Sequence, residues 1–152
     1  MTAHRYATSL HWTGSTADGI RSYSRDHVGT TDPPTTAVPL SADPAFRGNP
    51  ERLNPEQLVV MAASSCQMLS FLGAAARASV EVLVYHDDAT SHLDLTARPV
   101  RLGEVRLHPT VTVGADVSPA RVLQLAVQAH RECYVAGSLS VPVVVETTVV
   151  TP

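Results

Sequence analysis

The sequence predicts an α+β fold whose strands pair mainly antiparallel. The first observation is an uncharged segment from Gln57 to Ala76 that follows a strong helix-start signal. The second is a shorter amphipathic helix that begins near Ser118. The third is that alternating segments precede, separate and follow these two helices. The order strands, helix, strands, helix, strand is typical of the α+β class.

The long helix is predicted over residues 54–77. Asn54 suits the N-cap and Pro55 the first helical position, where a missing N–H costs nothing. Gln57 stands three residues after Asn54, as in a capping box. Glu56 places a carboxylate in the first turn, where it favours the helix dipole. These residues fix the start of the helix.

Apolar residues surround this helix on every side rather than forming one stripe. A helix of this kind is normally buried, and a membrane span is the alternative. We favour burial, because small and polar residues dilute a segment that is barely long enough to span. These residues are Ser64, Ser65, Gln67, Ser70 and Gly73. The sequence thus predicts a buried central helix with Cys66 near its middle.

The region before the helix is predicted to begin with a hairpin. Residues 5–12 alternate loosely and read as a strand, residues 13–19 are turn material, and residues 20–28 read as a second strand. On such a strand Arg21, Tyr23 and Arg25 would share one face.

The following segment is predicted to be mostly irregular. Residues 29–34 read as a loop, and residues 41–53 contain several proline and glycine residues. Between them a short strand over residues 37–40 includes Pro39. Because proline cannot donate to a sheet ladder, we place this strand at an edge.

Beyond the central helix, strands are predicted over residues 80–85, near residues 92–95, and over residues 101–113 with a bend near Pro109. A final strand covers residues 141–150.

A second helix separates the last two of these strands. Ser118 and Pro119 repeat the cap-plus-proline signal. An apolar stripe runs from Val122 to Ala129, and Cys133 continues it. Gly137 is the predicted helix stop. Cys133 is therefore expected to point inward from this helix.

Length and composition predict one domain over residues 1–152, large enough to bury a core without disulfides. The net charge of −3 gives no reason to expect nucleic acid or an anionic membrane as a partner. The first residues lack an apolar secretory segment, and two cysteines make no disulfide framework. A cytoplasmic location is the expectation.

Two cysteines could carry chemistry, although each could instead be an inert buried residue. Free cysteine is among the most buried residue types and behaves as a small hydrophobe. If Cys66 is reactive, a cation must come from elsewhere in the fold, because apolar surroundings raise a thiol pKa. Cys133 also points inward, so the two could meet. No Cys-x-x-Cys motif indicates thioredoxin-like chemistry.

Metal ligation is a weaker reading. His86, Asp87, Asp88 and His92 could supply ligands, but their spacing matches no closed zinc pattern. We expect exposed or structural roles and no metal.

One pattern is more specific. Asn54-Pro-Glu-Gln-Leu58 followed by Ala63-Ser-Ser-Cys66 resembles the signature of the OsmC/Ohr family of thiol peroxidases. The spacing of ten residues from Glu56 to Cys66 agrees, as does a second cysteine, Cys133, on a late helix. The predicted strand order agrees over nearly the whole chain.

The resemblance implies an intertwined homodimer in which sheets wrap around two central helices. It implies reduction of organic hydroperoxides, with Cys66 as the peroxidatic and Cys133 as the resolving thiol. Glu56 would belong to an assisting Arg–Glu pair. No bound cofactor is implied, and recycling would come from an external dithiol reductant, often a lipoyl-bearing protein.

The chain also departs from the family pattern. The family's arginine maps onto Arg25 or Arg47, with Arg21 as a third candidate. The segment His130-Arg-Glu-Cys-Tyr134 differs from the Cys-Pro usual in better-known members. The chain thus resembles a divergent branch of the family.

The expected mechanism holds Cys66 as a thiolate beside an arginine in an apolar pocket. The predicted lining, Met61, Met68, Phe46 and Phe71, favours alkyl or lipid hydroperoxides. The alternative is a non-enzymatic binding protein with inert cysteines. For the peroxidase, ten helical residues separate Glu56 from Cys66 by roughly 15 Å, so Glu56 is expected to serve the thiol of a partner chain.

Overall fold

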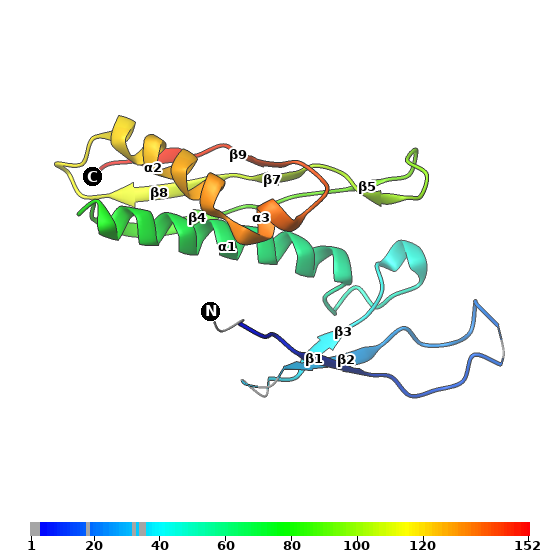
Figure 1. The fold of residues 1–152 in the computed structure, drawn as a ribbon. Coiled ribbons are helices and arrows are strands. Elements are labelled where there is room, and N and C mark those ends of the chain that lie inside the picture. The colour runs from blue at the N-terminus through cyan, green and yellow to red at the C-terminus, as the bar shows by residue number, and fades with distance from the viewer. Residues whose placement is uncertain (1–3, 18, 32, 34–35) are drawn as a thin grey trace. The chain divides into compact units, whose positions relative to one another are not determined.

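The computed structural model of the protein describes residues 4–17, 19–31, 33 and 36–152 (Figure 1). The chain clusters into two compact units, Met1–Leu58 and Val59–Pro152, and each is described by itself. That the whole chain acts as one domain stays a prediction.

The first unit contains a three-stranded antiparallel sheet. Its strands are β1 (Thr8–His11), β2 (His27–Thr31) and β3 (Val38–Leu40), in the order β1-β2-β3. A 3-10 helix, η1, follows at Pro44–Phe46. Pro39 lies in the outer strand β3, so the predicted edge strand is confirmed.

The predicted strand over residues 20–28 is wrong, because β2 begins only at His27. Side chains, rather than a neighbouring strand, donate hydrogen bonds to the backbone carbonyls of this segment. The Arg25 guanidinium donates to the carbonyls of Tyr23 and Ile20, and the Trp12 indole donates to the Ser24 carbonyl at 2.8 Å. These contacts hold the segment as an ordered turn.

The predicted loop over residues 29–34 is also wrong in its first half, because Gly29–Thr31 pairs with β1 as part of β2. Asp32 and Pro34 of that loop, and Asp18 of the predicted turn, lie outside the described residues.

A charged anchor holds the segment that leads into the long helix. The Asp26 carboxylate accepts from Asn49 Nδ2 at 3.4 Å and pairs with Arg52 Nε at 3.2 Å. A hydrogen bond from Ser41 is the largest of the influences that hold the pKa of Asp26 below its ordinary value. The exposed position of the carboxylate makes this a positioning contact more than a stabilising one.

The long helix α1 covers Pro55–Arg77, as predicted. Its capping box is confirmed atom by atom. The Gln57 N–H donates to Asn54 Oδ1 at 2.8 Å, and the Asn54 N–H donates to Gln57 Oε1 at 3.0 Å. By length and composition alone α1 could cross a membrane, although core helices of folded domains meet the same test.

The second unit contains the remaining strands and two further helices. They are β4 (Val82–Asp87), β5 (Leu93–Asp94), β6 (Arg101–Leu102), β7 (Val105–Leu107), β8 (Pro109–Val113), α2 (Pro119–Glu132), α3 (Tyr134–Ser138), β9 (Val143–Val145) and β10 (Thr148–Val150). The sheets have the orders β10-β8-β4, β7-β9 and β5-β6.

Pairing in the described parts of the chain is mixed, with four antiparallel and two parallel strand pairs. The parallel pairs, β10 with β8 and β7 with β9, arise because α2 and α3 connect the strands by a crossover. The predicted final strand over residues 141–150 is divided into β9 and β10.

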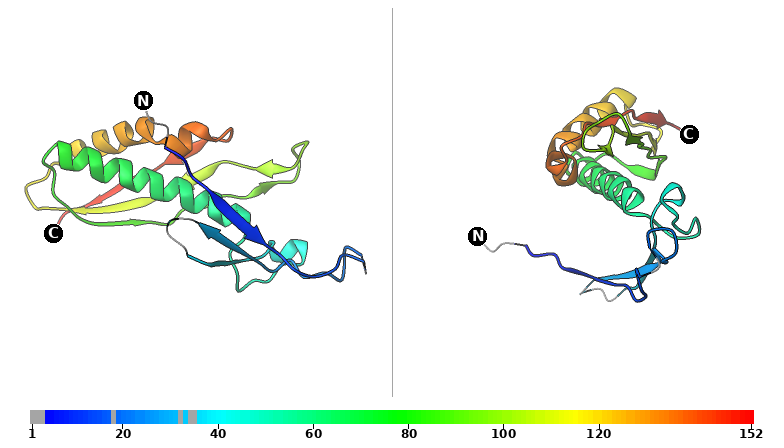
Figure 2. Two further views of the ribbon diagram at one scale, coloured as in Figure 1. Left: turned by 60° about the horizontal axis from the view of Figure 1, so that its bottom comes forward. Right: turned by 90° about the vertical axis from the view of Figure 1, so that its right-hand side faces the viewer.

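Helices α1 and α2 lie alongside the strands of the second unit (Figures 1 and 2). The main core joins Phe71, Ala74 and Ala75 of α1 to β8 and α2. The partners are Val111, Val113, Val122, Leu125, Ala126 and Ala129. A second cluster places Ala63 against Val105 and Leu107 of β7. The two long helices are thus packed on each other and on the β10-β8-β4 sheet, and α1 also contacts the separate β7-β9 sheet.

Burial of α1 within the chain is less complete than the sequence predicts. Five of its residues are buried, namely Ala63, Gln67, Phe71, Ala74 and Ala75. Met61 and Leu69 are 53% and 62% exposed. The single chain covers only one side of this apolar helix.

The alternation predicted over residues 101–113 is confirmed from Val105 to Val113, where every second residue is buried. The break falls at His108, whose N–H donates to Asp87 Oδ1 at 2.7 Å instead of to a ladder. The other oxygen of Asp87 accepts from Ser64 Oγ at 2.5 Å. Asp87 therefore ties β4 both to α1 and to the bend between β7 and β8.

Replacing Asp87 with alanine is expected to lower the free energy of unfolding by about 2 kcal/mol, because two half-buried donors lose a charged acceptor. The midpoint of urea unfolding measures the change. Asp88→Ala is the matched control, because Asp88 is exposed and pairs only with His86 among the described residues. Equal midpoints for the two variants would contradict the role given to Asp87.

Candidate functional site

Cys66 lies near the middle of α1 and is partly exposed. The capping box fixes the start of this helix, and the Phe71, Ala74 and Ala75 contacts fix its C-terminal half against the core. The thiol is therefore held on a rigid element rather than on a loop.

Cys133 does not lie on the second helix, so its predicted place on the helical stripe is wrong. α2 ends at Glu132, and Cys133 has the extended backbone angles φ −74° and ψ 108° between α2 and α3. Its N–H still donates to the His130 carbonyl at 3.3 Å. The side chain is 3% exposed, so the expected inward direction is confirmed.

The fold brings the two cysteines near each other as free thiols, and each side chain is among the groups that shift the pKa of the other. Cys66 comes from α1 and Cys133 from the joint between α2 and α3, 67 residues later in the sequence. The sequence alone does not predict whether the two cysteines lie close together, and the tertiary structure shows that they do.

The environment acts on the two thiols in opposite directions. Burial is the largest single influence on each thiol, and by itself it would raise the pKa of both. At Cys66 hydrogen bonds outweigh burial and hold the pKa of the thiol below its ordinary value. At Cys133 burial prevails, with the neighbouring Cys66, and raises the pKa of the thiol.

The groups that lower the pKa of Cys66 were missed by sequence reasoning. They are the backbone N–H groups of Val135 and Tyr134, the Cys133 thiol and the Ser70 hydroxyl. An expected cation is not among these strongest influences. Ser70 could have been found, because it stands one helical turn after Cys66. The backbone groups could not, because α3 was not predicted as a separate helix.

Arg25 and Glu56 line one pocket in the first unit, with a volume of about 380 Å³. The remaining lining is largely aromatic and polar, with Trp12, Tyr23 and Phe46 among its members. The Arg25 guanidinium stacks on the Tyr23 ring at 3.9 Å. Of the three candidate arginines, Arg25 is therefore the one that shares a pocket with Glu56.

Arg47 and Arg21 are placed differently. Arg47 follows η1 with a left-handed φ of 66° and is exposed, and its N–H donates to the Pro44 carbonyl. Arg21 is exposed in the turn before β2. Neither residue lines the pocket that contains Glu56.

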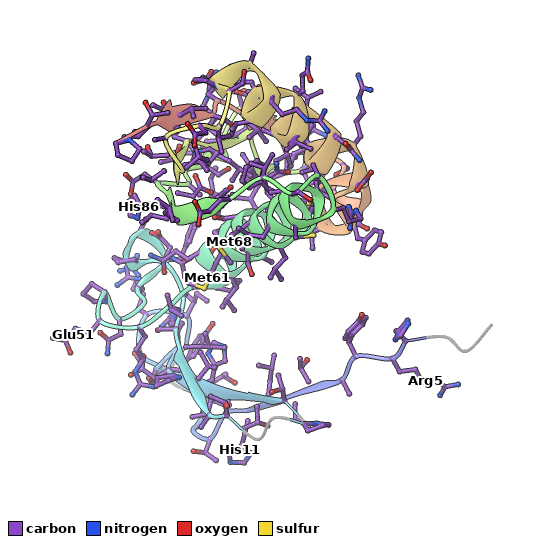
Figure 3. All side chains as sticks on the ribbon, turned by 90° about the vertical axis from the view of Figure 1, so that its left-hand side faces the viewer. Arg5, His11, Glu51, Met61, Met68 and His86 are labelled. Atoms are coloured by element: carbon purple, nitrogen blue, oxygen red, sulfur yellow. The ribbon has the colours of Figure 1, made fainter. Side chains whose placement is uncertain are left out.

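The predicted apolar lining is dispersed. Phe46 lines the pocket of the first unit. Phe71 is fully buried against Tyr85 in the core of the second unit, with ring centroids 5.8 Å apart, so its predicted lining role is wrong. Met61 and Met68 lie on the side of α1 that faces away from α2 (Figure 3).

The acidic and histidine residues near β4 serve other contacts. Exposed His86 pairs with Asp88 at 3.2 Å, and Asp87 binds Ser64 and His108. Within the described ranges no three histidine, cysteine or acidic side chains converge as metal ligands would.

The comparisons with known proteins place the chain. Residues 48–148 match the family model described as OsmC-like protein. An OsmC-like protein of unknown function from Vibrio cholerae has a TM-score of 0.86 and 27% identity, over 95% of this chain and 99% of that chain. No curated protein matches the sequence.

Two solved organic hydroperoxide resistance proteins share the fold at lower identity. The protein from Legionella pneumophila has a TM-score of 0.73 and 17% identity, over 98% of each chain. The protein from Elizabethkingia anophelis has a TM-score of 0.74 and 18% identity, over 99% of each chain. With its two long helices, its mixed sheets and a family match over most of its length, the chain belongs to the OsmC-like family.

Proposed function

We propose that the protein is a cysteine-based peroxidase that reduces organic hydroperoxides in defence against oxidative stress. The observation that carries this proposal is the paired, unequal thiols. Cys66 has a lowered pKa and is partly exposed, whereas Cys133 is buried with a raised pKa. A peroxidatic thiol needs a lowered pKa and access to the substrate, whereas a resolving thiol can be buried and have a raised pKa.

In the first step the Cys66 thiolate attacks the distal oxygen of the hydroperoxide. The O–O bond breaks, Cys66 becomes a sulfenic acid, and the alkoxide leaves and takes up a proton to form the alcohol. Hydrogen bonds from Val135, Tyr134 and Ser70 lower the pKa of the Cys66 thiol and so favour its ionised form. Access is open because Cys66 is partly exposed.

In the second step the Cys133 sulfur attacks the Cys66 sulfur, a disulfide forms, and hydroxide leaves as water. The proximity of the two side chains supports this step. An external dithiol then reduces the disulfide and is itself oxidised. We assign this role to a reductant of the lipoyl-bearing class, with no cofactor bound to the protein itself.

The substrate class follows from the apolar surfaces near the two candidate groups. Phe46 and Trp12 in the pocket of the first unit favour an alkyl or lipid hydroperoxide over hydrogen peroxide. Such substrates and a thiol reductant are consistent with action in the cytoplasm, without a nucleic-acid or membrane partner.

The active form is proposed to be a homodimer built on α1. An exposed apolar helix face of this kind marks an interaction surface. Met61 and Leu69 are both more than half exposed. A second copy of α1 is the partner whose chemistry matches this face.

The dimer would also complete the site. Glu56 and Cys66 are ten residues apart on α1, which is roughly 15 Å along the axis and about 80° around it. A glutamate side chain cannot span that distance. Two antiparallel α1 helices would instead bring the pocket of Arg25 and Glu56 towards Cys66 of the partner subunit. A charge-assisted Arg–Glu pair there would orient the guanidinium at the thiolate.

A non-enzymatic binding protein is the second candidate, and the pocket of about 380 Å³ favours it. That reading requires inert cysteines, for which buried thiols with raised pKa values are typical. The lowered pKa of Cys66 speaks against it.

Cys66→Ser is expected to abolish hydroperoxide turnover, because the alcohol is not a nucleophile of comparable strength, while the unfolding midpoint changes little. Peroxide consumption with a panel of alkyl hydroperoxides measures the loss. In the unaltered protein the rate should rise with pH through the Cys66 pKa, with its midpoint below the ordinary pKa of a thiol, about 8.5. Full activity in the serine variant, or a Cys66 pKa at or above the reference, would favour the binding protein.

Cys133→Ser is expected to complete one turnover and then stop, because the sulfenic acid at Cys66 lacks its partner. Mass spectrometry with a sulfenic-acid trapping reagent should find label at Cys66, and further oxidation after prolonged exposure to peroxide. If this variant cycles normally with a dithiol reductant, Cys133 is not the resolving residue.

A mixture of Glu56→Ala and Cys66→Ser proteins is expected to recover activity after subunit exchange, although each protein alone is inactive. After random exchange of an equal mixture half of the dimers are mixed, and each mixed dimer has one intact site of two, so activity should approach about a quarter of that of the unaltered protein. Exchange is verified by mass spectrometry of differently tagged chains. No recovery after verified exchange, or a monomer in sedimentation, would overturn the shared site.

A further inference from the structure

We propose that Gln67 is a positioning residue that fixes the register of α1 against α2 and thereby holds the thiol groups of Cys66 and Cys133 together. The inference rests on the proposed function in one respect, namely that these two thiols react with each other. It concerns a residue to which the peroxidase chemistry assigns no role.

Gln67 is a buried polar residue in an otherwise apolar interface. It follows Cys66 directly on α1, and its side chain is 1% exposed. Its Nε2 donates to the Ala126 carbonyl on α2 at 3.3 Å. This hydrogen bond joins the two helices that lead to the two cysteines.

The position of Ala126 links this bond to the site. Cys133 comes seven residues after Ala126, directly after the last residue of α2, which is about 10 Å along the helix. If α2 slid along α1, the Gln67 bond would break and Cys133 would move by the same distance. The Gln67 hydrogen bond and the approach of the two thiols therefore depend on the same alignment of α2 along α1.

Apolar packing alone specifies this register weakly. The helix residues of this core include Phe71, Val122 and Leu125, but the other four are alanine, namely Ala74 and Ala75 on α1 and Ala126 and Ala129 on α2. Such small, similar side chains leave alternative offsets close in energy, whereas a hydrogen bond is directional. A single buried polar residue fixes helix register in the same way in coiled coils.

The bonding of Gln67 is incomplete, which argues against a role in stability. Its Oε1 is buried and has no partner among the residues that the structure describes. A buried amide with an unpaired oxygen is costly, and an apolar side chain of similar shape is often no less stable. Gln67 therefore contributes to the position of α2 along α1 rather than to the stability of the fold.

The test is the equilibrium between the two thiols and dithiothreitol. Oxidised dithiothreitol takes two electrons and two protons from Cys66 and Cys133, which form a disulfide, and becomes the dithiol. We expect Gln67→Leu to lower this equilibrium constant about tenfold, or about 30 mV for a two-electron couple. Gln67→Met, which keeps the length and loses the hydrogen bond, should do the same.

Gln128→Leu is the matched control. Gln128 also donates from Nε2, to Glu132 Oε1 at 3.0 Å, but that bond lies on the exposed surface of α2. The control should keep the equilibrium constant of the unaltered protein. All three variants should keep its unfolding midpoint, so that a change of register is separated from a change of stability.

The titration of the Cys66 thiol by alkylation against pH gives a second measure that needs neither a disulfide nor peroxide. Loss of register should raise its pKa in both Gln67 variants, because Cys133, Tyr134 and Val135 would withdraw. Unchanged values of both measures in either Gln67 variant, or failure of both variants to fold, would overturn the proposal. Inactivity towards peroxides with shifted values would contradict only the peroxidase function.

Discussion

The site depends on one constraint, the packing of α1 against α2. Two thiols can exchange a bond only if their sulfurs are held in contact, and here the cysteines are 67 residues apart in the chain. Phe71, Ala74 and Ala75 pack against α2 and β8, and that packing carries Cys133 to Cys66. The chemistry of the two cysteines depends on this interface.

The second determinant is the break between α2 and α3. Had α2 continued through Cys133, the backbone N–H groups of Tyr134 and Val135 would be bound within the helix. Because the chain is extended at Cys133, these groups are available to the sulfur of Cys66. The same break leaves Cys133 buried and raises the pKa of its thiol. One backbone feature thus contributes to the opposite shifts of the two pKa values.

The family membership constrains the fold more than the chemistry. A TM-score of 0.86 at 27% identity establishes a shared architecture with a protein of unknown function. The organic hydroperoxide resistance proteins share the fold at 17% and 18% identity. A fold of this kind can host unrelated functions, so the function is argued from the thiols and from the pocket of Arg25 and Glu56.

The sequence by itself determined the α+β class, the bounds of α1 with its capping box, the edge strand at Pro39 and the buried alternation from Val105 to Val113. These features are local, since they depend on spacing and on neighbouring residues. Tertiary structure decided the turn before β2, the break at Cys133, the meeting of the thiols and the pocket that Arg25 shares with Glu56. Each of these depends on contacts between residues distant in the chain, which no local pattern encodes.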